Sequence, residues 1–250
     1  MPLYKEQGIV LRSMKLGEAD KIVTILTQGS GKVRGVAKGI RRTTSKFGAR
    51  LEPLTHVSLL MYRGRNLDTV TQAEIVSPFR TIRGDFELIA AGEAMLEAAD
   101  KVSEDHERNV RLFLLLLAGL RALEARPHDP AAVAESFLLK LLSLSGFHPS
   151  LTACAACGSP GPHGWFSAGQ GGVVCSDCAQ HEAGRATESA LRWLDAVARV
   201  DLIGAGDMTP AVPVRREARA LLYGFTEYYL ERRIRSFSLL ARQPDSTLAR

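Results

Sequence analysis

Apolar and polar residues alternate in short segments over the first third of the chain, as they do in β-strands. Residues 3–76 are rich in β-branched residues, and turn signals such as Gln28-Gly29-Ser30-Gly31 and Arg63-Gly64-Arg65-Asn66 interrupt them. We predict five strands, within residues 8–16, 20–27, 32–39, 51–62 and 67–76. In the fourth, Val57, Leu59 and Met61 share one face. Five short strands avoid exposed edges by closing, so the pattern favours a five-stranded antiparallel OB barrel.

After Pro78 the apolar spacing becomes helical. We predict helices over residues 85–102, 108–125, 130–146, 188–200 and 214–236. The second of these is apolar nearly all round, which predicts a buried central helix. Asp129 and Pro130 provide an N-cap and a first-turn proline for the third, which Gly146 closes. The chain is therefore predicted to be an α+β protein of two domains, an OB-fold domain in residues 1–79 and a helical domain in residues 80–250.

Composition indicates a folded protein whose positive charge is concentrated at one end. Apolar residues make up 46% of the chain, and no window reaches the roughly 18 uninterrupted apolar residues that cross a bilayer. The N-terminus lacks the apolar stretch of a signal peptide, so we expect a cytoplasmic protein with no membrane partner. Residues 1–80 hold 14 Lys and Arg against 6 Asp and Glu, whereas the rest holds 18 against 21. This asymmetry indicates a polyanionic partner for the first domain.

The positive charge is densest in residues 32–50, which carry seven Lys and Arg and no acid. A solvated loop is the simpler interpretation, but solubility does not require so much self-repulsion. We predict a nucleic-acid site on the third strand, the loop after it and the next hairpin, near the ligand face of an OB barrel. The candidates are Lys32, Arg34, Lys38, Arg41, Arg42, Lys46, Arg50, Arg63 and Arg65. Aromatic residues for base stacking are few (Phe47, Tyr62 and Tyr4), so binding should depend on phosphates and little on base sequence.

All four cysteines of the chain form two Cys-x2-Cys pairs, at Cys154, Cys157, Cys175 and Cys178. Two such pairs supply four thiolates for a tetrahedral Zn²⁺, whereas disulfides are not expected in a cytosolic chain. The Gly- and Pro-rich insert between the pairs indicates a zinc-ribbon-like lobe at residues 150–182. Four thiolates leave no open coordination position, so we predict one structural zinc ion per chain. His163 and His181 flank the motif; either could replace a cysteine, but surface positions are the simpler interpretation.

Signatures of enzymes mostly fail. The segment Gly29-Ser30-Gly31-Lys32 is similar to the end of a P-loop, but Leu26 stands where that motif needs a glycine and Val33 where it needs Ser or Thr. The segment His-Glu-Ala-Gly-Arg at 181–185 begins like a zinc-protease helix but ends on Arg185 instead of the second histidine. We therefore expect no enzymatic activity. Two alternatives stay open: an RNA-binding OB protein of translation or ribosome assembly, and a metal-dependent enzyme that uses the zinc lobe.

The last predicted helix has basic ends. Solvated charge on a helix surface is the simpler interpretation, and a groove for an acidic partner peptide is the alternative. The candidate residues for that groove are Arg215, Arg216, Arg219, Arg232 and Arg233.

The segment GIVLRSMKLGEADKIVTILTQGSGKVRGVAKGIRRTTSKFGARLEPL, residues 8–54, resembles the N-terminal pattern of the bacterial RecO family. It has that family's Gly-Glu-x-Asp turn at Gly17, its Gly-Lys hairpin, its Ala-Lys-Gly-x-Arg-Arg loop and its Leu-Glu-Pro strand start. The helical remainder and the four cysteines are compatible with the family. Leu16 departs from it, because many members have an aromatic residue there. The resemblance implies an OB-fold domain followed by a helical domain with a zinc lobe.

The resemblance also implies a function in DNA repair and homologous recombination. Members of the family bind single- and double-stranded DNA, anneal complementary strands and help to load the RecA recombinase onto strands coated by single-strand-binding protein (SSB). They act with RecR and contact the acidic C-terminal tail of SSB, a role that the basic ends of the last helix fit by charge. A cytoplasmic, nucleoid-associated location follows from these partners.

Overall fold

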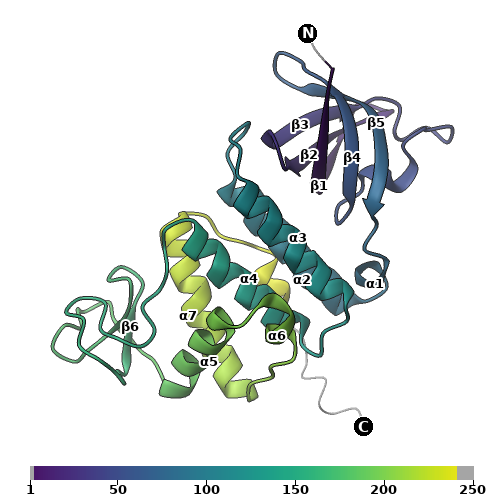
Figure 1. Ribbon diagram of the computed structural model, residues 1–250. Coiled ribbons are helices and arrows are strands. Elements are labelled where there is room, and N and C mark those ends of the chain that lie inside the picture. Colours follow the sequence, from purple (N-terminus) through teal and green to yellow (C-terminus); the bar gives the residue numbers. More distant parts are fainter. Residues whose placement is uncertain (1–2, 241–250) are drawn as a thin grey trace.

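The computed structural model describes residues 3–240 and consists of a β-barrel, a helical domain and a small lobe (Figure 1). The barrel lies at one end of the molecule and the lobe around β6 at the other, with the helices between them. Residues 241–250 of the predicted second domain lie outside the described residues. No helix within residues 3–240 is long and apolar enough to cross a membrane.

Five strands close the barrel in the order β1-β2-β3-β5-β4, as predicted in number and closure. They are β1 (Leu3–Leu16), β2 (Asp20–Thr27), β3 (Gly31–Ala37), β4 (His56–Tyr62) and β5 (Asp68–Ser77). The barrel is not wholly antiparallel, since β3 and β5 pair in parallel at Gly35 and Asp68. One parallel pair is required, because an odd number of strands cannot close with every neighbouring pair antiparallel. β4 also begins later than predicted, because Gly48–Leu51 forms a short 3-10 helix.

Side chains from the strands and from the long connection fill the barrel together. Val57, Leu59 and Met61 share the inward face, as predicted, and each is at most 2% exposed. The connection between β3 and β4 adds Ile40, Phe47 and Leu51 to the same apolar cluster. These anchors hold the connection on the barrel at separate points, while residues 41–46 between Ile40 and Phe47 extend toward solvent (Figure 1).

Eight helices follow the barrel in the described part of the chain. They are α1 (Arg80–Arg83), α2 (Phe86–Val102), α3 (Val110–Glu124), α4 (Pro130–Leu144), α5 (Glu188–Arg199), α6 (Leu202–Gly206), α7 (Val212–Leu230) and α8 (Phe237–Leu240). Asp129 caps α4 by accepting a hydrogen bond from the backbone N–H of Ala132, and Pro130 occupies its first turn, as predicted. α7 stops at Leu230 rather than near residue 236, because Glu231 adopts the left-handed conformation with a φ of 50°.

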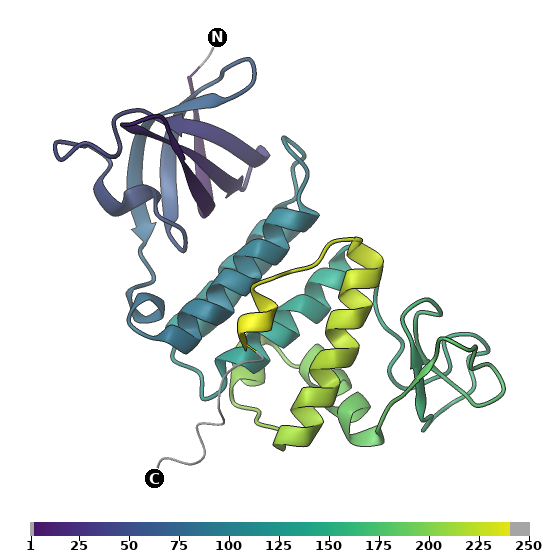
Figure 2. The ribbon, with the colours of Figure 1, turned by 180° about the vertical axis from the view of Figure 1, so that it is seen from behind.

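The central helix is α4, which corrects our expectation for residues 108–125. α4 contacts α2, α3, α5, α6 and α7, and nearly all of its side chains are buried. α3 instead keeps one side toward solvent, where Leu114 is 50% exposed. Figure 2 shows the segment after α7 returning along the helices to α8.

The barrel packs directly against the helices, so the two domains share one apolar cluster. Ile9, Leu11 and Leu26 of the barrel belong to the same buried cluster as residues of α2 and α3. The ring of His56 packs edge-on against Phe113 of α3, with 5.9 Å between the ring centroids. Burial lowers the pKa of His56, so its ring is neutral in this apolar setting. The barrel therefore has a fixed position on the helical domain.

The lobe between α4 and α5 is a small sheet docked on α7. Its strands are β6 (Trp165–Ser167), β7 (Gly172–Val174) and β8 (Gly184–Arg185), in the order β7-β6-β8. An aromatic contact joins the two, since the ring centroids of Phe166 in β6 and Phe225 in α7 are 6.0 Å apart. The lobe thus depends on α7 for its apolar contacts and has little core of its own.

Candidate nucleic-acid interface and metal centre

Residues 38–50, which we call the basic loop, present exposed cations from a backbone that buried side chains anchor to the barrel. The buried side chains of Ile40 and Phe47 hold the loop on the barrel. The cations between and beside these anchors are all exposed: Lys38, Arg41, Arg42, Lys46 and Arg50. The apolar anchors point inward and the charges outward, so the order of residues along the loop produces a basic surface.

The contacts of the basic loop leave its charge uncompensated. Arg41 donates to the carbonyl oxygen of Glu18 at 2.7 Å, and Lys46 Nζ donates to that of Thr71 at 2.7 Å. Arg50 likewise donates to the carbonyl oxygen of Lys46 at 2.7 Å. Carbonyl groups satisfy hydrogen-bond donors without cancelling their charge. Within residues 3–240, none of the five loop cations is in an ion pair.

The structure places Lys32 away from this surface, in the seam between the two domains. Its Nζ donates to the carbonyl oxygen of Asp100 at 2.8 Å and lies 3.4 Å from the Asp100 carboxylate, with its side chain 13% exposed. Arg12, which the sequence analysis did not select, pairs with the same carboxylate at 2.8 Å. We therefore leave Lys32 out of the interface, because its charge is already compensated and holds the barrel to α2.

The other predicted cations of the barrel lie on β3 and in the hairpin between β4 and β5. Arg34 is half-buried on the outward side of β3, opposite Thr24 of β2, and its Nε is buried with no hydrogen-bond partner among the described residues. Arg63 lies over the ring of Tyr4, 5.0 Å from the centroid, and Arg65 is exposed in the same hairpin. Both arginines of the hairpin are thus exposed cations at the end of β4, apart from the run of the basic loop.

Of the three aromatic residues predicted as stacking platforms, one remains accessible. Phe47 is 1% exposed because it anchors the basic loop. The ring of Tyr4 is covered by Arg63, and its hydroxyl donates to Asp68. Burial and the Asp68 carboxylate raise the pKa of Tyr4, which keeps that hydroxyl protonated. Tyr62 is 42% exposed.

The four cysteines converge in the lobe in a geometry that fits a tetrahedral metal ion. The Sγ atoms of Cys154, Cys157, Cys175 and Cys178 all lie within 4.8 Å of one another. Cys157 and Cys175 are 3.9 Å apart at sulfur, close to the roughly 3.8 Å edge of a tetrahedron with Zn–S bonds of about 2.3 Å. The backbone N–H of Cys175 donates to Cys154 Sγ at 3.4 Å, and this donation contributes most to lowering the pKa of Cys154 to about 6. The donor set therefore suits Zn²⁺, which these four thiolates would hold.

The two histidines beside the motif lie outside the cysteine cluster. The ring Nε2 of His163 is 3.0 Å from the carbonyl oxygen of Ser159. His181 is exposed, and neither histidine belongs to the group of side chains that converges on the site. Four cysteine ligands would saturate a tetrahedral ion, so the site has the form of a structural centre.

Two of the five arginines predicted to bind a partner are held by acids of α4 and its cap. Arg215 bonds to the Asp129 carboxylate through two nitrogens. Arg219 Nε donates to Glu135 Oε1 at 2.6 Å, with the two side chains 11% and 1% exposed. These contacts attach α7 to α4. Of the predicted set, Arg216, Arg232 and Arg233 are exposed.

A small apolar cavity lies beside Arg233, between α4, α7 and α8. It measures about 160 Å³, and its walls are Leu138, Tyr223, Thr226, Glu227, Arg233, Ile234 and Phe237. The Tyr223 hydroxyl is buried there and has no hydrogen-bond partner among the described residues. A second hollow of about 540 Å³ adjoins it at Arg233 and is lined by Lys101, Arg232, Arg233 and Arg235. Lys101 pairs with Glu97 at 3.5 Å and Arg233 with Glu227 at 3.4 Å, so the four cations of the hollow exceed the two acids that pair with them. An apolar cavity next to such a hollow suits an acidic ligand with an apolar side chain.

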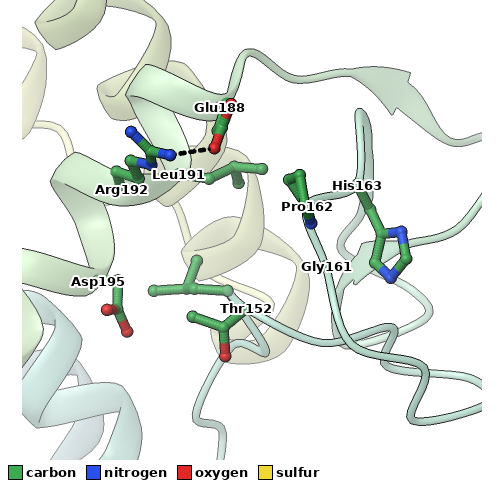
Figure 3. A pocket seen from close by; sticks show the side chains of 9 residues that line it. Thr152, Gly161, Pro162, His163, Glu188, Leu191, Arg192 and Asp195 are labelled. Atoms are coloured by element: carbon green, nitrogen blue, oxygen red, sulfur yellow. Dashed lines mark hydrogen bonds and ion pairs between the residues drawn. The ribbon is translucent and has the colours of Figure 1, made fainter.

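A third cavity of about 240 Å³ separates the lobe from α5 (Figure 3). Its α5 side carries Glu188, Arg192 and Asp195, and its lobe side carries Pro162 and His163. The charged groups are already paired, Glu188 with Arg192 and Asp195 with Arg199. This cavity therefore offers little net charge to a nucleic acid.

Comparison with known proteins matches both domains of the chain. Residues 1–79 match the family model described as "Recombination protein O N terminal", and residues 83–237 match "Recombination protein O C terminal". The chain belongs to the RecO family. The resemblance seen in residues 8–54 is thereby confirmed and extends over the helical domain.

Relatives within the RecO family align over nearly their whole length. A protein of Frankia casuarinae is 45% identical over 244 residues, covering 97% of this chain and 100% of the relative. A protein of a Nocardioides species is 45% identical over 249 residues, covering 96% of this chain and 100% of the relative. A protein of Thermobifida fusca is 42% identical over 244 residues, covering 97% and 100%. All three are named DNA repair protein RecO.

Proposed function

We propose that this chain is a DNA repair and recombination mediator that binds single- and double-stranded DNA through backbone phosphates and anneals complementary strands. The observation that supports this most directly is the basic loop, whose five exposed cations face solvent without an acid to compensate them. Membership of the RecO family, whose curated relatives are named as DNA repair proteins, supports the same function. In this proposal the protein also assists RecA loading on SSB-coated strands together with RecR, and performs no covalent chemistry.

Annealing in this scheme is an electrostatic process. Two complementary strands repel each other because each carries one negative charge per nucleotide. Cations on a loop with buried anchors neutralise phosphates of both strands at a smaller backbone ordering cost than those of a free loop. Contacts to phosphates leave the base edges free, so the bases remain available for pairing. The same contacts carry little sequence information, which fits a protein that acts on any damaged sequence.

Replacing Lys38 and Arg42 with alanine is expected to weaken single-stranded DNA binding on the order of 20-fold at 0.1 M salt. Each lost phosphate contact should lower the slope of log affinity against log salt by about 0.7, or about 1.4 for the pair. Neither side chain makes a hydrogen bond within residues 3–240, so the fold should be retained. The measurement is fluorescence anisotropy of a labelled oligothymidylate over a salt series, with strand annealing as a second readout.

The matched control removes two exposed arginines from α5, Arg192 and Arg199, which are 77% and 69% exposed. It changes net charge by the same amount at a site far from the basic loop. Equal losses in both variants would mean that overall charge, and not the basic loop, governs binding. An unchanged salt slope in the Lys38 and Arg42 variant would remove the basic loop as the DNA site.

We propose further that the acidic C-terminal tail of SSB binds at the cavity between α4, α7 and α8. The cationic hollow around Arg232 and Arg233 would receive the acidic residues, and the apolar cavity would receive an apolar side chain of the tail. The buried Tyr223 hydroxyl supports this assignment, because a bound peptide would supply the hydrogen bond that it lacks. Of the predicted set, Arg232 and Arg233 line this site. Arg215 and Arg219 do not, and the walls of the cavity are mainly apolar side chains.

Replacing Arg232 and Arg233 with alanine is expected to weaken binding of a labelled SSB-tail peptide about 10-fold, since each removes a charge-assisted contact. Tyr223→Phe should weaken it by a smaller factor, about 2- to 10-fold, through loss of one hydrogen bond. Anisotropy titrations give both values, and the Arg192 and Arg199 double variant again serves as the charge-matched control. Wild-type affinity in both test variants would show that the tail binds elsewhere.

A further inference from the structure

The outward side of strands β1 and β4 forms a second surface of the barrel that is not part of the basic loop. The register pairs Leu3 with Tyr62, Lys5 with Leu60 and Gln7 with Ser58, so these six side chains alternate with the buried ones and point outward. We call this surface the β1–β4 face. Leu3 and Tyr62 are 56% and 42% exposed at one end of it.

At the other end, the β1–β4 face opens into a polar hollow of about 460 Å³. The turn between β2 and β3 contributes Gln28 and Gly29 to its lining, and the segment before α3 contributes Arg108. Lys5 and Arg108 give the hollow two cations against one carboxylate, Glu6. That carboxylate already accepts hydrogen bonds from the backbone N–H of Gly29 at 3.0 Å and from Ser30 Oγ at 2.6 Å. The lining of the hollow therefore carries one more positive than negative charge, and its carboxylate is turned toward the β2–β3 turn.

The β1–β4 face also carries hydrogen-bonding groups that the fold does not use. Among the described residues, none forms a hydrogen bond with the side-chain amides of Gln7 and Gln28. Amide groups donate and accept, as the edges of unpaired bases do. The accessible ring of Tyr62 adds a stacking surface next to the arginines of the β4–β5 hairpin. Stacking surface, amides and cations thus follow one another along two paired strands.

We propose that the β1–β4 face binds a single-stranded DNA segment, with a base stacked on Tyr62 and the backbone near Lys5 and Arg108. This inference rests on the proposed DNA-binding function and adds a second strand site to it. A single strand fits better than a duplex, since stacking on Tyr62 and bonding to the glutamine amides both require unpaired bases.

The basic loop and the β1–β4 face are adjacent to each other, with β5 between them. β5 lies between β3 and β4 in the barrel, and Lys46 of the basic loop contacts it at Thr71. The basic loop and the β1–β4 face therefore border β5 from its two sides. One chain can hold two strands next to each other, which is the arrangement that annealing requires.

The test counts strands per chain. Labelled decathymidylate is titrated into the full-length protein at low salt, where binding is tight enough to give a stoichiometry. We expect two oligonucleotides per chain for the wild type and one for the variant Lys5→Ala with Arg108→Ala. Lys38→Ala with Arg42→Ala should also bind one, and the Arg192 and Arg199 control should bind two.

Tyr62 is tested with two variants and two ligands. Tyr62→Ala should weaken the second binding event about 5- to 10-fold, the loss expected for one stacked base, whereas Tyr62→Phe should retain it. An abasic oligonucleotide of the same length should bind the wild type and Tyr62→Ala equally, because it has no base to stack. Weaker abasic binding by Tyr62→Ala would instead assign Tyr62 a structural role and overturn its part in the site.

The outcomes separate this inference from the proposed function. The β1–β4 face would be refuted as a DNA site if the Lys5 and Arg108 variant still bound two oligonucleotides. It would also be refuted if the wild type bound only one and the Lys38 and Arg42 variant alone lost it. Both outcomes would leave the basic loop as the DNA site. Binding that neither pair of substitutions changes would refute both.

Discussion

Replacing Glu135 with alanine is expected to lower the free energy of unfolding by about 3–5 kcal/mol. Glu135 is 1% exposed in the middle of α4, where it accepts hydrogen bonds from Arg219 Nε at 2.6 Å and from Trp193 Nε1 at 3.2 Å. Burial raises the pKa of the Glu135 carboxyl, and the Arg219 guanidinium offsets part of that effect. Without Glu135, the guanidinium of Arg219 stays buried with no opposite charge, which is the costly outcome. Urea unfolding followed by circular dichroism measures the change.

The control is Asp195→Ala, which breaks the surface pair with Arg199 and should cost less than about 1 kcal/mol. The double variant Glu135→Leu with Arg219→Met should recover most of the lost stability, because it removes both charges. The same experiment decides the role of Arg219. Arg219 would be a partner contact after all under two conditions. Glu135→Ala would lower the free energy of unfolding by less than about 1 kcal/mol, and Arg219→Ala would weaken binding of the SSB-tail peptide without changing the stability of the protein.

The sequence predicted the strands of the barrel because one face of each is buried and the other is not. Val57, Leu59 and Met61 carry that alternation, and they fill the barrel as expected. The parallel pairing of β3 with β5 could not be predicted in this way. Alternation of apolar and polar residues shows which face of a strand is buried, but not which strand lies beside it. In the same way, α3 and α4 are both apolar nearly all round, and only the packing shows that α4 is central.

The candidate sites show the same limit at the level of single charges. A run of cations without acids predicted a basic surface, and the basic loop presents one. Lys32 belongs to the same run, but its partner Asp100 lies 68 residues away along the chain. Arg219 has its partner at a separation of 84 residues. Local charge patterns thus predict where cations are dense, while tertiary packing decides which of them remain exposed.

Replacing Cys175 with serine is expected to abolish stoichiometric metal binding and to unfold the lobe. The four Sγ atoms within 4.8 Å of one another would lose one of their thiolates, and a three-thiolate site holds Zn²⁺ less tightly. Because the lobe has short strands and a small core, metal binding and folding of the lobe are coupled, and the loss should amount to several kcal/mol locally. We expect rapid proteolysis within residues 150–186 and less than one zinc per chain by native mass spectrometry.

The control for this variant is Ser176→Ala, an exposed neighbour of Cys175 that contributes no ligand. It should keep one metal ion and resist protease as the wild type does. DNA affinity should be within about 2-fold of wild type in both variants, because the basic loop lies on the barrel and the lobe at the far end of the helices. A Cys175→Ser protein with an intact, protease-resistant lobe would refute the metal centre. If only the lobe unfolded and DNA binding were lost with it, the lobe would be part of the DNA interface. The DNA strand would then have to run the length of the helical domain.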